Sequence, residues 1–182
     1  MGQDSINPFD LELDMEERNP LAYKTEFITT FCEKVSEGGG LDAQTKSLID
    51  RAVRAVYKDY LKSKGKGAPP LLGDFRAALQ KMNNSRADEL ALSLERFVDG
   101  ALNTFSKPTN IDTGNSLICY SLSGLRDQMK PIGTLITLDH LLGRVMRNYK
   151  AGKITFVYAD EFAILFQDED TGRFFANLWR RI

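Results

Sequence analysis

Residues 153–166 have the sequence KITFVYADEFAILF. The apolar run at 154–159 is rich in β-branched and aromatic residues, a composition that favours a buried strand. The run ends at two adjacent acids, Asp160 and Glu161, and apolar residues resume directly after them. The segment therefore predicts a strand that ends on a pair of carboxylates.

The residues before this strand predict its partner in a parallel sheet. Residues 116–122, SLICYSL, are a short apolar run without helical phase and predict a second buried strand. Residues 123–150 predict a long helix with a broad apolar face and with Pro131 near its start. A strand, a helix and a strand in this order form a unit whose strands are parallel. Open parallel sheets bind ligands at the carboxyl ends of their strands, where the two acids would lie.

The first half of the chain predicts helices. Apolar residues recur at helical spacing in about four segments, with short connections between them: 21–35, 43–61, 71–82 and 86–102. Pro20 suits the first turn of a helix, and Asp42 and Ser85 are candidate N-caps. A last amphipathic helix is predicted over 168–182. The predicted fold class is α/β, rich in helix.

Composition excludes several classes of function. Lys and Arg number 24 against 25 Asp and Glu, so the net charge of -1 gives no general attraction to nucleic acid or membrane. No apolar run approaches the roughly 18 residues of a membrane-spanning helix, and the polar N-terminus is unlike a secretory signal. Cys32 and Cys119 have no CxxC partner and predict buried free thiols. The single histidine, His140, has no nucleophile near it in sequence, so a catalytic triad is disfavoured.

An apolar strand that ends in Asp-Glu is the pattern of a Walker B element. In P-loop NTPases the first acid holds Mg²⁺ through coordinated water, and the second orients or deprotonates the attacking water. The alternative is an ordinary strand whose terminal acids cap the following helix. The motif alone leaves both interpretations open.

Three stretches together resemble a known family. INPFDLELD at 6–14, LDAQTKSLIDRAVRAVY at 41–57 and FVYADEFAILFQDEDTGRFFANLWRRI at 156–182 are similar in order and spacing to segments of the large VirB-type ATPase. This cytoplasmic ATPase of type IV secretion and conjugative transfer belongs to the DNA-translocase-related branch of P-loop NTPases. The resemblance implies that residues 1–18 and 113–182 form part of a RecA-like parallel-sheet core. Residues 19–112 would then be an inserted all-α subdomain.

The resemblance also implies site residues and cofactors. Asp160 would bind the nucleotide's Mg²⁺ through water, Glu161 would be the catalytic acid, and the parent protein would use ATP and Mg²⁺. No Gly-x-x-x-x-Gly-Lys-Ser/Thr loop occurs in the sequence, so we expect an internal fragment that neither holds a nucleotide tightly nor hydrolyses ATP alone. Arg180 and Arg181 are either arginines that reach a neighbour's nucleotide or the solvated end of a helix.

The partners implied by the resemblance are other type IV secretion components and further copies of the chain, since the family forms hexamers. Single-stranded DNA is a further candidate partner. The expected location is the cytoplasm, at the membrane face through partners. The alternative function is a non-catalytic helical module for protein interaction. If neighbouring core strands are missing, the two predicted strands should leave apolar edges that make the chain self-associate or that its own N-terminal segment covers.

Overall fold

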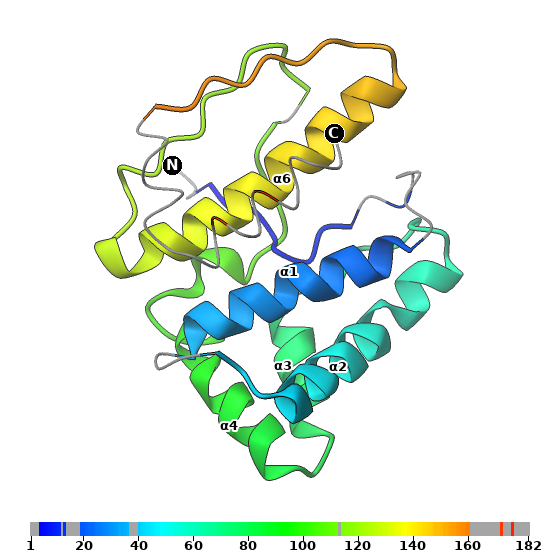
Figure 1. The fold of residues 1–182 in the computed structure, drawn as a ribbon, viewed down its shortest axis with the longest axis vertical. Coiled ribbons are helices and arrows are strands. Elements are labelled where there is room, and N and C mark those ends of the chain that lie inside the picture. The colour runs from blue at the N-terminus through cyan, green and yellow to red at the C-terminus, as the bar shows by residue number, and fades with distance from the viewer. Residues whose placement is uncertain are drawn as a thin grey trace.

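The computed structural model describes residues 4–11, 13, 19–36, 40–112, 114–160, 172 and 176. These residues form six α-helices and two short 3₁₀ turns (Figure 1). The elements in chain order are α1 Pro20–Val35, α2 Ala43–Lys62, α3 Leu72–Gln80, α4 Ser85–Ser93, α5 Glu95–Val98, η1 Asn103–Phe105, η2 Asp127–Met129 and α6 Lys130–Lys150.

The predicted helices in the first half of the chain are confirmed, and their boundaries follow the capping signals. Pro20 occupies the first turn of α1 after the N-cap Asn19, and the side chain of Asp42 accepts the Thr45 backbone N–H at the start of α2. Two details differ from the prediction. The cap of α4 is Asn84, whose side chain accepts backbone N–H groups, so Ser85 is already helical. The predicted helix over 86–102 is divided at Leu94 into α4 and α5.

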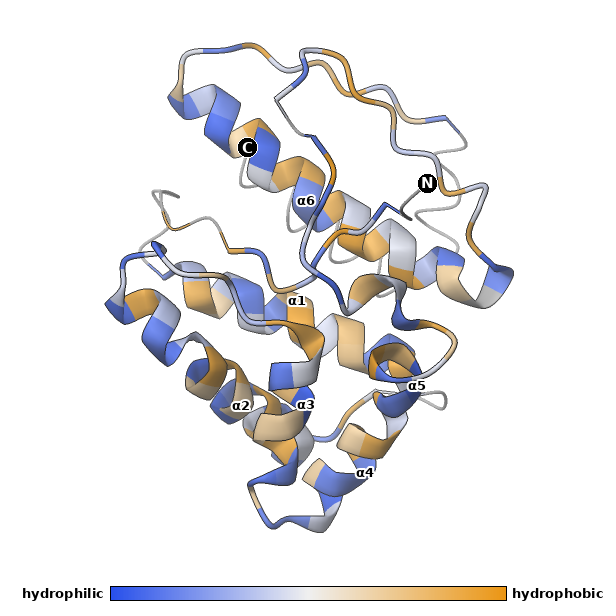
Figure 2. Ribbon diagram, turned by 180° about the vertical axis from the view of Figure 1, so that it is seen from behind, coloured by the Kyte–Doolittle hydropathy of each residue, from blue (hydrophilic) through white to orange (hydrophobic). Residues whose placement is uncertain are grey.

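The helices are stacked in layers, with α1 between α6 and α2 (Figure 1). The apolar residues of α1 and α2 face inward, and their charged residues other than Lys24 of α1 lie mostly on the outer side (Figure 2). One hydrophobic core joins all parts of this stack, and it includes Phe9 of the N-terminal segment, Phe31 of α1, Tyr57 of α2, Phe75 of α3 and Leu135 of α6. The described residues therefore pack around a single core.

Helix α6 begins later than the sequence predicts. Residues 123–126 are turn and irregular, η2 follows, and α6 starts at Lys130 with Pro131 in its first turn. Gly133 faces the preceding loop so closely that a Cβ there would lie 2.3 Å from Cδ1 of Leu125. This close approach lets the loop pack on the first turn of α6.

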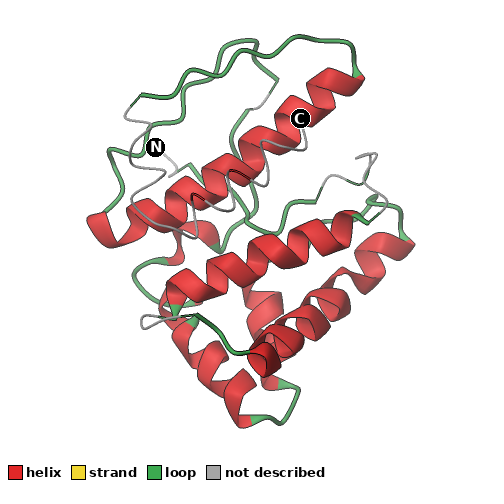
Figure 3. Ribbon diagram, in the orientation of Figure 1, coloured by secondary structure: helices red, strands yellow, loops and turns green. Residues whose placement is uncertain are grey.

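Neither predicted strand is formed. Residues 116–122 and 154–159 are described and contain no strand, and no strand occurs elsewhere in the described residues (Figure 3). The side chains of Ile154, Phe156 and Tyr158 are 84%, 76% and 92% exposed. A strand exists only when neighbouring strands accept and donate its backbone hydrogen bonds, and these segments lack that pairing here. The helix-rich class is thus confirmed, whereas the predicted parallel-sheet core is not.

The predicted C-terminal helix over 168–182 lies outside the described residues, apart from Gly172 and Ala176, which are both helical. Among the residues that the structure describes, no helix has the length and apolar character needed to cross a membrane.

Candidate functional site

The N-terminal Asn-Pro-Phe-Asp segment lies between the helices and is fixed by hydrogen bonds. Asn7 is 2% exposed, and its Nδ2 donates to the carbonyl of Pro70 at 3.0 Å and to Oδ1 of Asp10 at 3.1 Å. Its Oδ1 accepts the N–H of Phe9 at 3.0 Å, and its own N–H donates to Oγ1 of Thr109 at 2.8 Å. Through its side-chain amide and its backbone N–H, Asn7 therefore connects three segments that are distant in sequence: its own, the one at Pro70 and the one at Thr109.

Phe9 carries the same segment into the core. Its ring is fully buried, with its centroid 5.4 Å from that of Phe75 and 6.3 Å from that of Tyr57. The Tyr57 hydroxyl donates a hydrogen bond to the Phe9 carbonyl at 2.6 Å. This contact satisfies a buried carbonyl that has no helix or sheet to pair with.

A buried ion pair connects α1 with α6 beside this segment. Lys24 is 2% exposed and its Nζ lies 2.7 Å from Oδ2 of Asp139, whose side chain is 10% exposed. The same Nζ donates to the Pro8 carbonyl at 3.2 Å and lies 4.6 Å from the ring centroid of Phe27. The other carboxylate oxygen of Asp139 accepts the hydroxyl of Tyr23 at 2.9 Å. Both charges are thus paired and further hydrogen-bonded, as burial requires.

His140 lies next to the ion pair and lines a small cavity of about 30 Å³ together with the charged residues Asp10, Lys24, Asp139 and Arg147. A cavity of this size has room for a water molecule or two. Burial holds the pKa of His140 below its ordinary value, although Asp10 and Asp139 oppose that shift. Within the described part of the chain, the buried Nε2 of His140 has no hydrogen-bond partner. The neutral imidazole is therefore the favoured form.

These contacts join α1, α6 and the N-terminal segment in one structural junction. Lys24 is held by Asp139, and His140 has an aromatic neighbour, Tyr120, at a ring distance of 6.0 Å in an edge arrangement. The sequence analysis did not identify Lys24. The sequence nevertheless indicates that Lys24 is buried. It lies three positions before Phe27 and four before Ile28, and this spacing places it on the apolar face of α1.

The predicted nucleotide-site acids lie elsewhere in the chain. Asp160 is exposed and follows the irregular segment 153–159, while Glu161, Arg180 and Arg181 lie outside the described residues. The described residues contain no group of three or more His, Cys, Asp or Glu side chains that could hold a metal ion. They also provide no phosphate-binding loop. The predicted roles of Asp160 and Glu161 in a Mg²⁺–ATP site therefore stay predictions.

The fold of this chain was compared with known proteins. No protein-family model matches this sequence, and no curated protein matches it. The structure of VirB4 of Thermoanaerobacter pseudethanolicus is similar, with a TM-score of 0.65 and 20% sequence identity over 80% of this chain. The match covers 42% of the VirB4 chain, so this chain spans less than half of that protein's length.

The resemblance to VirB-type ATPases seen in the sequence is therefore confirmed at the level of the fold. At 20% identity the likeness establishes shared architecture and leaves activity to be argued separately.

Proposed function

We propose that this chain is a segment of an ATPase that powers type IV secretion or conjugative DNA transfer. The observation that carries the proposal is the likeness to VirB4 over 80% of the chain, which agrees with the sequence resemblance in three separate stretches. Residues 19–112 would be the inserted helical subdomain, and residues 1–18 and 113–182 would contribute to a nucleotide-binding core.

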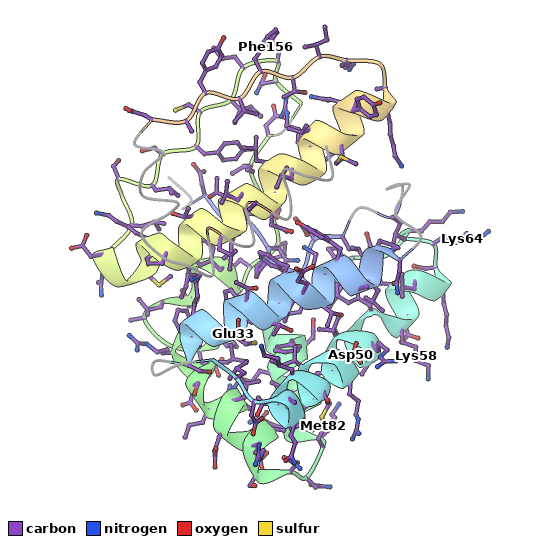
Figure 4. The ribbon with its side chains drawn as sticks, in the orientation of Figure 1. Glu33, Asp50, Lys58, Lys64, Met82 and Phe156 are labelled. Atoms are coloured by element: carbon purple, nitrogen blue, oxygen red, sulfur yellow. The ribbon has the colours of Figure 1, made fainter. Side chains whose placement is uncertain are left out.

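The exposed apolar segment after α6 supports the assignment to a core. Ile154, Phe156 and Tyr158 project into solvent, and Phe156 lies at the outer edge of the molecule (Figure 4). Val157 and Ala159 lie at the alternating positions, so 156–159 is an unbroken apolar run, which is typical of a strand that is covered on both faces in a parallel sheet. Neighbouring strands would complete this pairing and would place Asp160 and Glu161 at the end of a buried strand.

In that setting the two acids would have different roles. Asp160 would hold Mg²⁺ through coordinated water, and Glu161 would orient the attacking water. The phosphate-binding pattern does not occur in the 182 residues, so the chain by itself should not turn over ATP. The proposed partners are other secretion components and further copies of the chain, and the proposed location is the cytoplasmic side of the membrane.

Phosphate release tests this proposal in two arrangements. The chain alone should show no magnesium-dependent turnover. A chimera that carries this chain in place of the matched segment of VirB4 should hydrolyse ATP, and Glu161→Gln should abolish that turnover. Glu169→Gln, the same substitution in the acid-rich stretch DED at 168–170, is the matched control and should leave the rate near that of the chimera.

Two results would contradict the proposal. Turnover by the chain alone that Glu161→Gln abolishes would show a complete site within these residues. An active chimera that tolerates Glu161→Gln would favour the alternative, a helical module for protein interaction. That alternative is supported by the described residues, which form a helical bundle without a sheet.

A further inference from the structure

A groove runs between α2 and α3 on the surface of the helical stack. It encloses about 740 Å³, which falls in the range of sites that bind other molecules. The large apolar side chains that line it are Val56 and Tyr60 of α2 and Met82, which follows α3. All three are half-buried and pack against the hydrophobic core. The groove therefore presents an apolar surface that the core holds in place.

The charged residues of the groove are of two kinds. The two acids already have partners in the chain: Oδ1 of Asp59 lies 3.7 Å from Nζ of Lys62, and Asp74 accepts the N-cap backbone N–H of α3 at 2.8 Å. The two bases, Arg51 and Lys81, are exposed. Within the described part of the chain, neither basic side chain has an ion pair or a hydrogen bond. The charge that remains unpaired in the groove is therefore positive.

The two bases lie at the same end of the groove. Arg51 is in the first half of α2, and Lys81 is the C-cap of α3. Figure 4 places Met82, the residue after Lys81, beside the first half of α2. An occupant that complements the groove is therefore apolar along its length and carries carboxylates at the end that meets Arg51 and Lys81.

The walls of the groove suit a helix. The apolar face of an amphipathic helix commonly binds in a groove of this kind. Small side chains, those of Ala55, Ala77 and Ala78, line the groove on both helices. They allow a third helix to approach at the interaxial distance of about 8–10 Å that packed helices have. Met82 is flexible and polarizable, so it can adapt to the side chains of such a helix.

We propose that the α2–α3 groove binds an acidic amphipathic helix of another protein. The apolar face of that helix lies on Val56, Tyr60 and Met82, and its carboxylates bind Arg51 and Lys81. The groove thus selects an acidic helix over a basic helix with the same apolar pattern. The proposal rests on the groove alone, so it would stand if the proposed ATPase function failed.

Fluorescence anisotropy with two designed peptides and the full 182-residue chain tests the proposal. Both peptides have about 14 residues, or about four helical turns, with leucine at helical spacing. One carries two glutamates near one end, and the other carries two lysines at the same positions. We expect the acidic peptide to bind about tenfold more tightly at low salt, and the difference to shrink as salt screens the charges.

Variants of the chain separate the groove from a general effect of charge. Arg51→Glu, Lys81→Glu should reverse the preference, so that the basic peptide binds more tightly. Lys58→Glu, Lys64→Glu is the matched control, because it makes the same change in net charge at exposed lysines that do not line the groove, and it should keep the preference. Ala55→Gln places a longer polar side chain in the apolar middle without changing the charge, and it should weaken both peptides about tenfold.

Unchanged far-ultraviolet circular dichroism would confirm that each variant folds, since all the substituted residues are exposed. Equal binding of the two peptides, or no measurable binding of either, would overturn the proposal. So would a preference that Lys58→Glu, Lys64→Glu removes, because the acidic peptide would then respond to charge outside the groove. Self-association of the chain that Ala55→Gln abolishes would assign the groove to a second copy and would also overturn it.

Discussion

Replacing Lys24 by Met should destabilise the protein far more than the loss of an ordinary surface charge. The substitution keeps a long unbranched side chain on α1 but removes the charge that faces Asp139 at 2.7 Å. Asp139 is 10% exposed and would keep the Tyr23 hydroxyl as a hydrogen-bond donor. The Pro8 carbonyl would also lose the donor that Nζ supplies. The variant therefore leaves a buried carboxylate with the Tyr23 hydroxyl as its donor, where it had both that hydroxyl and the Lys24 ammonium.

The expected cost follows from this burial. Removing one partner of a buried ion pair costs about 3–5 kcal/mol, because the remaining charge is uncompensated. We expect a value near the lower end, about 3 kcal/mol, since the Tyr23 hydroxyl still contacts the carboxylate. For a domain of this size each kcal/mol lowers the melting temperature by roughly 2–4 °C, so the melting temperature should fall by about 6–12 °C.

Urea unfolding monitored by circular dichroism measures this free energy directly. Lys62→Met is the matched control, because Lys62 and Asp59 form a long 3.7 Å pair with side chains 67% and 93% exposed. That substitution should cost less than about 1 kcal/mol. In the double variant Lys24→Met, Asp139→Leu the stability should recover, since an apolar pair of similar volume carries no buried charge. A cost for Lys24→Met no larger than the control, or no recovery in the double variant, would refute the reasoning.

Further outcomes follow from single groups. The pKa of His140 lies below its ordinary value of 6.5, so the unfolded chain binds the proton more tightly. The free energy of unfolding should therefore fall as pH drops below about 6.5. Urea titrations at pH 7.5 and 5.5 measure this difference, which should be smaller for His140→Gln than for the unmodified chain. Tyr57→Phe removes the 2.6 Å donor to the buried Phe9 carbonyl and should cost about 1–3 kcal/mol in the same assay. Burial raises the pKa of the Cys32 thiol, whereas Cys119 is exposed, contrary to the prediction that both thiols are buried. Maleimide should therefore label only Cys119 until the protein is denatured, and mass spectrometry would show which cysteine is labelled.

The helices of the first half of the chain could be predicted because their signals are local. Apolar periodicity sets the buried face, and Pro20 and Asp42 mark two starts within a residue of the observed boundaries. The break at Leu94 had no comparable signal. The start of α6 had one, because Pro131 lies in its first turn as Pro20 does in α1, but the predicted helix was extended back to residue 123. The loop before α6 packs on its first turn, where Leu125 lies close to Gly133. Tertiary packing decides boundaries of this kind.

The strands could not be predicted with the same security, because a strand is not a local structure. Residues 116–122 and 154–159 have the composition of buried strands, yet the described residues supply no hydrogen-bonding partner for them. The junction around Lys24 was missed for a related reason. A lysine in an apolar stripe indicates burial, but its partner Asp139 is 115 positions away in sequence. Only the three-dimensional packing identifies that pair.

The contacts of the junction bear on how the proposed subdomain would move. Asn7 to Pro70, Phe9 to Tyr57 and Lys24 to Asp139 all cross the predicted boundaries at 18/19 and 112/113. Moving the helical part away from α6 would expose the Lys24–Asp139 pair and part of the shared core. Exposing this buried, hydrogen-bonded junction together with apolar surface would cost free energy. If the proposed core binds a nucleotide, a small shift of α6 should therefore move α1 with it as a rigid body. If the proposed ATPase function holds, the helical insertion and α6 should therefore act as one body.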